Sequence, residues 1–126
     1  MTFVPITTEK FDRQFKKLSK GNSTFEKQVI KKIPGICEHP ELGEPKSENL
    51  KGLRGVHITK HFVAVYLLFE NFVIFINISH HDEAYDTNKI EQRIKRLPED
   101  KNLLRALEKA KVAPEEFIEF IKTIGK

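Results

Sequence analysis

Two histidines and a tyrosine follow an apolar run and are the residues best suited to proton transfer. His80, His81 and Tyr85 come soon after residues 72–76, which read Phe-Val-Ile-Phe-Ile. That run is β-branched and aromatic, too short to span a membrane and typical of a buried strand. Side chains at the end of a strand are held by the sheet and still meet solvent. Since histidine has an unperturbed pKa close to neutrality, we expect acid or base chemistry at this strand end.

The same histidines are poorly placed for a metal site if the strand continues through them. Adjacent side chains on extended backbone point to opposite faces, so we expect only one of His80 and His81 to face a common site. A metal needs convergent ligands, which disfavours a site built from residues 80–83. The single cysteine, Cys37, excludes an internal disulfide framework and a cysteine-based zinc cluster, and suits a reducing cytosol. We therefore expect no metal and no cofactor.

The charge distribution bears on the kind of partner. The 126 residues fit one domain with an appendage, and the net charge of +4 is compatible with a polyanionic partner. Of the 22 basic residues, 12 lie at or before Lys60 and 10 at or after Lys89, with none between them. If nucleic acid binds the sheet, its phosphates must be met from the first half or from the tail. The N-terminus lacks a basic region followed by a long apolar run, so we expect a cytoplasmic protein without a membrane anchor.

Helical spacing dominates the first third of the chain. Residues 3–6 predict a short edge strand, because Pro5 cannot donate to a central ladder. Phe11, Phe15 and Leu18 recur at helical spacing and predict an amphipathic helix with a basic outer face. A second apolar stripe over residues 25–33 predicts a second helix, which the Pro-Gly pair beginning at Pro34 should break or kink. The two helices form a hairpin able to cover one face of a sheet.

Three strands follow, over residues 53–59, 62–69 and 72–78, and their short turns imply an antiparallel meander. The order is β-α-α-β-β-β, an α+β fold whose antiparallel sheet carries the helical hairpin on one face. From residue 86 the pattern is helical, with Pro98 and Pro114 able to open new helices. The apolar stripes of this tail need a partner surface, either on the domain or on a second copy in a homodimer.

Three segments in this order resemble the RelE/ParE superfamily of bacterial and archaeal toxins. They are residues 49–55 (Asn-Leu-Lys-Gly-Leu-Arg-Gly), residues 62–66 (Phe-Val-Ala-Val-Tyr) and residues 81–85 (His-Asp-Glu-Ala-Tyr). The similarity covers about residues 5 to 86, which divides the chain into a RelE-like toxin domain at 1–86 and a C-terminal helical extension at 87–126. The resemblance implies a toxin that cleaves messenger RNA on the ribosome without a metal and is held inactive by a cognate antitoxin.

The resemblance also implies site residues. His81 matches the histidine of members that use one for catalysis, Tyr85 matches the aromatic that orients or stacks on a base, and His57 matches a basic position on the second strand of the family. Lys51 and Arg54 match the basic approach to that strand and would contact RNA. The arginine that active members carry just before the Val-Tyr pair is absent, and Lys60, His61 or Arg54 would have to replace it. We expect these side chains to converge on the open face of the sheet.

The reaction can be stated from chemistry alone. A base removes the 2′-hydroxyl proton, that oxygen attacks the adjacent phosphorus, cations stabilise the charge, and an acid protonates the departing 5′-oxygen. Two other readings stay open. The first is a non-catalytic toxin of the ParE kind, which inhibits a protein such as DNA gyrase by contact, and the second is a degenerate member that serves as a binding module. The pair His81 and Tyr85 favours the ribonuclease, and the missing arginine favours the other two.

Overall fold

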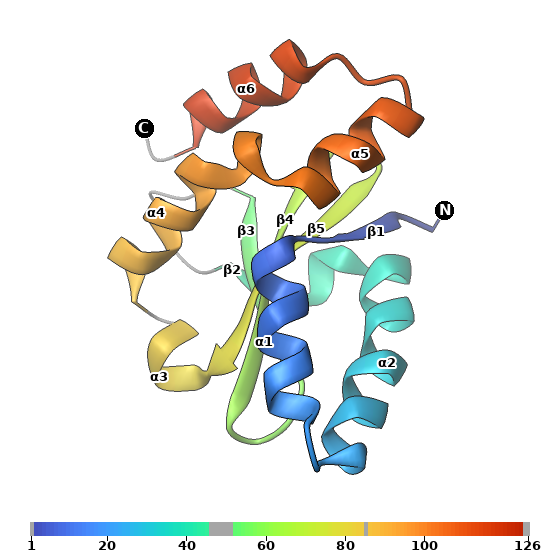
Figure 1. The fold of residues 1–126 in the computed structure, drawn as a ribbon, viewed down its shortest axis with the longest axis vertical. Coiled ribbons are helices and arrows are strands. Elements are labelled where there is room, and N and C mark those ends of the chain that lie inside the picture. The colour runs from blue at the N-terminus through green and yellow to red at the C-terminus, as the bar shows by residue number, and fades with distance from the viewer. Residues whose placement is uncertain (1, 46–51, 85, 125–126) are drawn as a thin grey trace.

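A five-stranded sheet of order β1-β5-β4-β3-β2 organises the chain (Figure 1). The computed structural model describes residues 2–45, 52–84 and 86–124. Strands β3 (Leu53–His57), β4 (Phe62–Phe69) and β5 (Phe72–His80) form an antiparallel meander, which confirms that prediction. The edge strand β1 (Val4–Thr7) pairs parallel with β5, so the sheet is mixed where a wholly antiparallel one was expected. A two-residue strand, β2 (Glu44–Pro45), pairs with β3 at the other edge of the sheet.

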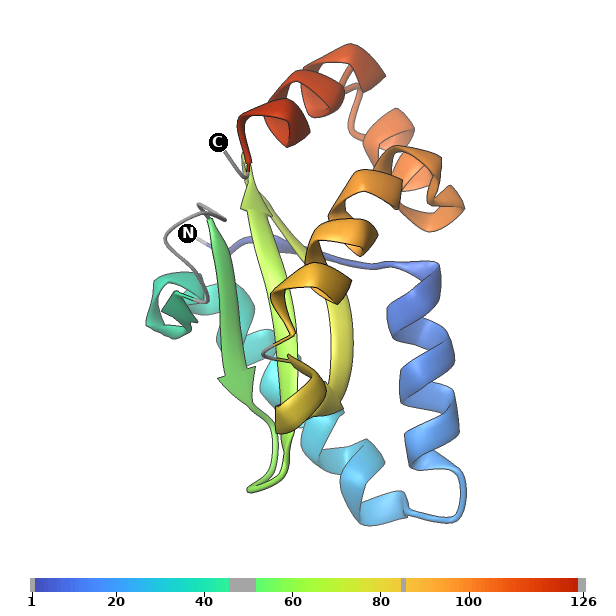
Figure 2. The same ribbon diagram turned by 90° about the vertical axis from the view of Figure 1, so that its left-hand side faces the viewer.

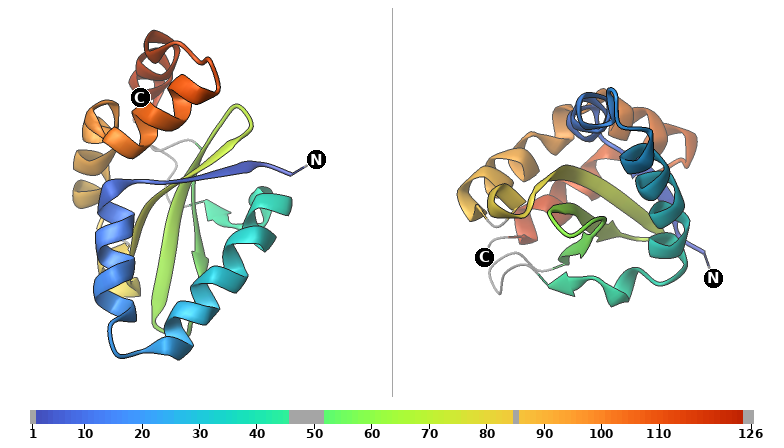
Figure 3. Two further views of the ribbon diagram at one scale, coloured as in Figure 1. Left: turned by 45° about the vertical axis from the view of Figure 1, so that its right-hand side comes forward. Right: turned by 90° about the horizontal axis from the view of Figure 1, so that it is seen from below.

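The predicted helical hairpin consists of α1 (Glu9–Ser19) and α2 (Ser23–Glu38), which meet at their turn and diverge in the left panel of Figure 3. The side chains of Thr8 and Asn22 cap the two N-termini by accepting backbone N–H groups of Phe11 and Phe25. Of the expected break or kink at Pro34, the break is wrong, because α2 continues through it. Pro34 and the exposed Ile30 one turn earlier face solvent, where water can meet the carbonyl that proline leaves without a donor.

Each face of the sheet has its own hydrophobic core. Beneath the hairpin, Phe11, Phe25 and Val29 pack against Tyr66 and Phe75 of the sheet. A short 3-10 helix, η1 (Pro40–Leu42), follows α2 at this side. Removing the aromatic and aliphatic side chains of this layer from water is the main stabilisation that holds the hairpin on the sheet.

The C-terminal tail covers the opposite face. After the short helix α3 (His81–Ala84), the tail comprises α4 (Thr87–Arg96), the 3-10 turn η2 (Leu97–Glu99), α5 (Lys101–Lys109) and α6 (Pro114–Thr123). Pro114 opens a helix as predicted, whereas Pro98 lies within η2 and α5 begins only after the capping residue Asp100. Figure 2 shows α4 and α5 beside the strands and α6 across their upper end.

Buried tail residues complete this second core. Ile90, Leu103, Leu107 and Phe117 are each no more than 2% exposed and pack in one cluster with strand residues such as Leu67. The prediction that the tail packs back on the domain is therefore confirmed. Across the described residues, no helix combines the length and the apolar character needed to cross a membrane.

Candidate functional site

The end of the sheet brings three histidines together. His80 is the last residue of β5, His81 opens α3, and His61 lies in the turn between β3 and β4. Pairing of Phe62 with His80 places the turn beside the end of β5. The backbone N–H of His81 donates to the carbonyl oxygen of His61 at 2.8 Å and fixes the turn against α3.

The imidazoles of this histidine cluster, His61, His80 and His81, converge. One ring nitrogen from each lies within 4.8 Å of the others. The rings of His80 and His81 are 4.4 Å apart, and those of His61 and His80 stack 6.0 Å apart at 5°. The expectation that His80 and His81 point to opposite faces is therefore wrong. It assumed continuous strand, but the backbone turns from strand to helix between the two residues.

One carboxylate serves two of these rings. Asp82 Oδ1 lies 3.0 Å from Nδ1 of His81, and its Oδ2 lies 3.4 Å from Nδ1 of His80. The backbone N–H of Asp82 also donates to Nδ1 of His80 at 3.3 Å, which suits the neutral ring. His80 can thus accept from Asp82 when neutral and face its carboxylate when protonated. With side chains 44% and 37% exposed, His80 and His81 are open to a substrate.

The histidine cluster can also supply metal ligands. Three imidazole nitrogens are the protein ligands of many tetrahedral zinc sites, and small rotations would bring these nitrogens to the spacing such a site needs. The sequence argument against a metal depended on divergent side chains, and that premise does not hold in this fold.

The other predicted residues do not gather at one place. Arg54 Nη1 donates to the carbonyl oxygens of Glu41 at 3.0 Å and Gly43 at 2.7 Å, on the hairpin side of the sheet. His57 is exposed and, three residues along the same strand, lies on the opposite face. The expected convergence of Arg54 with His57 is therefore wrong, because strand alternation separates them. Arg54 is engaged in holding the η1 segment.

Of the remaining predicted residues, Lys60 is exposed in the turn next to His61, where its ammonium can approach a phosphate bound at the histidine cluster. Lys51 and Tyr85 lie outside the described residues, and their predicted contacts with RNA stay predictions. His57 stays a prediction as well, since it lies on β3 in register with Val63 and is not one of the clustered histidines.

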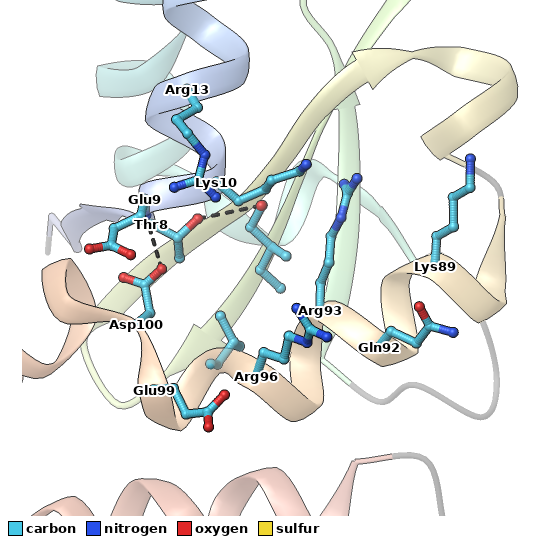
Figure 4. Close-up of a pocket in the computed structure, with 12 residues that line it drawn as sticks. Thr8, Glu9, Lys10, Arg13, Lys89, Gln92, Arg93, Arg96, Glu99 and Asp100 are labelled. Carbon is cyan, nitrogen blue, oxygen red and sulfur yellow. Dashed lines mark hydrogen bonds between the residues drawn. The ribbon is translucent and has the colours of Figure 1, made fainter.

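A second feature is a cleft of about 430 Å³ between α1 and α4, shown in Figure 4. Its floor includes Ile76 of β5. The side chains that give it its character are basic, and we call these five residues the basic cleft: Lys10, Arg13, Lys89, Arg93 and Arg96. No sequence motif predicts this site. The distribution of basic residues does contain a signal for it: they lie in the first half of the chain and in the tail, and the cleft contains residues from both.

Charges in the basic cleft act on one another. Burial lowers the pKa of Lys10, and the nearby charges of Arg93 and Arg13 lower it further. Burial also lowers the pKa of Arg93. Glu83 of α3, the helix that begins with His81, opposes the shift of the pKa at both residues. The carboxylate of Asp100 is occupied, since it accepts the backbone N–H groups of Glu9 and Leu103 at 2.9 and 3.0 Å.

Comparison with known proteins identifies the family. The family described as "ParE toxin of type II toxin-antitoxin system, parDE" matches residues 6–85. RelE4 of Methanocaldococcus jannaschii, described as a candidate toxin, is 35% identical over 81 residues, covering 63% of this chain and 86% of RelE4. An uncharacterised protein of Methanosarcina mazei is 33% identical over 87 residues, covering 68% of this chain and 100% of that protein.

The fold also resembles the solved structure of a toxin. A mutant of the E. coli toxin RelE in the free state matches with a TM-score of 0.60 at 18% identity, covering 76% of this chain and 98% of RelE. This structural match agrees with the α+β architecture described above, in which a helical hairpin covers one face of the sheet. The chain therefore belongs to the RelE/ParE superfamily and is a toxin of a toxin–antitoxin system.

Proposed function

We propose that this toxin is a metal-independent endoribonuclease that cleaves messenger RNA on the ribosome. The observation that carries the proposal is the convergence of three partly exposed imidazoles at the end of the sheet. Cleavage of RNA by its own 2′-hydroxyl needs a base and an acid close together, and two histidines can fill both roles near neutral pH. A ribosomal target also implies action in the cytoplasm.

The reaction assigns a role to each imidazole. A neutral ring of the pair His80 and His81 takes the 2′-hydroxyl proton, and the oxygen attacks the adjacent phosphorus. The bond from phosphorus to the 5′-oxygen then breaks, and a protonated ring gives its proton to that oxygen. The products are a 2′,3′-cyclic phosphate and a free 5′-hydroxyl. The carboxylate of Asp82 lies 3.4 and 3.0 Å from the Nδ1 atoms of His80 and His81 and can orient both rings. Each such proton transfer typically contributes about 10²–10⁴ in rate.

The missing arginine has a substitute in this arrangement. His61 stacks on His80, and Lys60 precedes it in the turn, so Lys60 and a protonated His61 could offer positive charge to the phosphorus oxygens. Tyr85, Lys51 and His57 retain the roles that the family resemblance implies. We assign the toxin domain to residues 1–86 and the helical extension to residues 87–126, and the family implies a cognate antitoxin as partner.

The test is induced expression followed by mapping of transcript ends. Wild type should arrest growth and create new 5′ ends in cellular messages. His81→Ala and His80→Ala should each lower cleavage by about 10²-fold or more. His39→Ala is a matched control, because His39 also lies near a carboxylate, Glu41 at 3.5 Å, but far along the chain from the cluster. Full cleavage by His81→Ala would contradict the assignment.

A second candidate is a toxin of the ParE kind that blocks a protein target without chemistry. The observation that favours it is β4, where residues 63–67 are all apolar or aromatic and buried, so this strand offers no arginine to a phosphate. The same experiment separates the two functions. Growth arrest without new transcript ends would favour the protein target, and co-purification of DNA gyrase would identify it.

A further inference from the structure

The basic cleft brings like charges together instead of dispersing them. Lys10 and Arg13 extend from α1, while Lys89, Arg93 and Arg96 extend from α4, and all five line the same 430 Å³ cavity. Figure 4 shows the head groups of Lys10 and Arg93 directed to the same side of the cleft. Charged residues on an ordinary solvated surface point apart, whereas these repel one another across a shared space.

These charges have few partners in the protein. Among the residues that the structure describes, no ion pair joins a cation of the basic cleft to a carboxylate. Three carboxylates also line the cleft, those of Glu9, Glu99 and Asp100, and the carboxylate of Asp100 is held by backbone N–H groups of two helices. An anion bound here would relieve repulsion that the fold otherwise tolerates.

The lining favours phosphate over an acidic peptide. A peptide usually anchors apolar side chains, but the apolar residues of the cleft, Ile76 and Leu97, are 1% and 3% exposed. Guanidinium groups, which Arg13, Arg93 and Arg96 provide, match phosphate oxygens through paired donors. The exposed groups available to a ligand are therefore almost all charged.

The arrangement suits a chain of phosphates more than a single one. On α1 the basic residues Lys10, Arg13 and Lys17 fall at i, i+3 and i+7, which places them along one face. Successive turns of a helix are about 5.4 Å apart, so this face presents a row of positive charge leading away from the cleft. The charge of Lys17 acts on Lys10, which makes the row continuous with the cleft.

We propose that the basic cleft binds the phosphodiester backbone of single-stranded nucleic acid, which in the context of the proposed ribonuclease function is the RNA substrate. The charge of Glu83, two residues after His81 on α3, acts on Lys10 and Arg93 of the cleft. RNA held between α1 and α4 would thus lie next to the helix that starts the histidine cluster. Contacts to the phosphodiester backbone position a nucleic-acid strand without distinguishing its bases. The cleft would therefore contribute affinity, and any preference for particular bases at the cleavage site would come from the histidine cluster.

Salt-dependent binding to a labelled oligonucleotide tests the proposal. The probes are a short single-stranded RNA of mixed sequence and the DNA of the same sequence, which lacks the attacking hydroxyl and cannot be cleaved. The variant K10Q/R93Q/R96Q removes three charges from the cleft. The control K27Q/K95Q/K109Q removes three exposed charges that do not line it, including one on α4 itself.

The expected result is quantitative. For single strands each phosphate contact contributes about 0.7 to the slope of log affinity against log salt, so the cleft variant should lose about two units of slope. The control should keep the wild-type slope, and RNA and DNA should respond alike. Circular dichroism and the urea midpoint of each variant show whether it is folded.

Two outcomes would overturn the proposal. One is an equal loss of affinity in the cleft and control variants, which would mean that only net charge matters. The other is unchanged nucleic-acid binding by the cleft variant together with lost antitoxin binding, which would assign the cleft to a protein. Neither depends on cleavage, since DNA binding is measured without it. If the protein does not cleave RNA, the cleft can still bind the oligonucleotides. If the cleft does not bind them, transcript cleavage can still occur, and its RNA must then be bound at another surface.

Discussion

The N–H of His81 donates to the carbonyl oxygen of His61 at 2.8 Å, so the two ends of the histidine cluster are joined through backbone. The turn that carries His61 is itself held by Thr59, whose hydroxyl oxygen accepts the backbone N–H groups of His61 and Phe62 at 3.3 and 3.2 Å. Ring positions therefore depend on a side chain that carries no chemistry of its own.

Replacing Thr59 by valine should loosen this turn while preserving the side-chain shape. We expect RNA cleavage to fall about tenfold or more, mainly in kcat, because a displacement of about 1 Å can cost about 10²-fold in rate. Thr59→Ser keeps the hydroxyl and should restore most of the activity. Steady-state kinetics on an RNA substrate measure both. A Thr59→Val protein with wild-type kcat would show that the turn does not position His61.

Zinc should inhibit the toxin, and chelators should not. A zinc ion held by His61, His80 and His81 would occupy the nitrogens that transfer protons. We expect cleavage to persist in EDTA, to fall on addition of zinc, and to recover when the metal is removed. His61→Ala should weaken the inhibition by removing one ligand. Activity that disappears in EDTA and returns with zinc would instead indicate a metal-dependent mechanism.

Gly43 lies against the ring and hydroxyl of Tyr66, so an added methyl group has no space there. The Tyr66 hydroxyl donates to the carbonyl oxygen of Pro40 at 2.6 Å and is fully buried. Gly43→Ala should displace the ring and lower the free energy of unfolding by about 1–3 kcal/mol, comparable to leaving a buried acceptor unpaired. Gly35→Ala in α2 meets open space and should instead stabilise by about 0.5–1 kcal/mol. Urea unfolding of the two variants should move in opposite directions.

Leu103 and Leu104 are neighbours on α5 that test whether the tail belongs to the core. Leu103 is 0% exposed and Leu104 is 36% exposed. Leu103→Ala should destabilise the whole protein by about 2–5 kcal/mol, and Leu104→Ala should do much less. Probes in the sheet and in the tail should report one unfolding transition. Separate transitions, with the sheet unaffected by Leu103→Ala, would mean that the extension folds independently.

Stability should fall at alkaline pH because of Cys37. Burial raises the pKa of its thiol above the ordinary value of 9.0. As pH rises past 9.0 the unfolded chain loses this proton while the native protein keeps it, so the unfolded state is favoured. Between about pH 8 and about pH 10 the urea midpoint of Cys37→Ala should therefore decrease less than that of the wild type. Identical decreases would remove Cys37 as the cause.

Much of the fold could be predicted because its signals are local. Apolar periodicity located the hairpin, the meander and the tail helices, since burial of one face dictates which positions are apolar. The path through Pro34 could not be predicted, because it depends on whether the unpaired carbonyl reaches water. Parallel pairing of β1 with β5 is likewise a long-range choice that no residue in β1 specifies.

Predictions about the site were wrong where they depended on the residue at which a strand or helix ends, because contacts distant in sequence decide that position. The end of β5 at His80 decides whether two adjacent imidazoles diverge or converge, and strand ends are the least certain feature of a sequence. The family resemblance predicts that Arg54 contacts RNA, but its guanidinium donates to the carbonyl oxygen of Gly43, eleven residues away. The basic cleft needs α1 and α4 side by side, and only the packed tail provides that geometry.

Asp100 caps two helices with one carboxylate: Oδ1 accepts from Leu103 at the start of α5, and Oδ2 accepts from Glu9 at the start of α1. Figure 4 shows the second of these bonds. Because Glu9 and Asp100 are 91 residues apart, a growing chain on the ribosome makes α1 long before its second cap exists. The basic cleft, which needs both helices, is likewise assembled only after α4 has emerged. During synthesis the nascent chain therefore has neither the second cap of α1 nor a complete basic cleft until most of the polypeptide has left the exit tunnel.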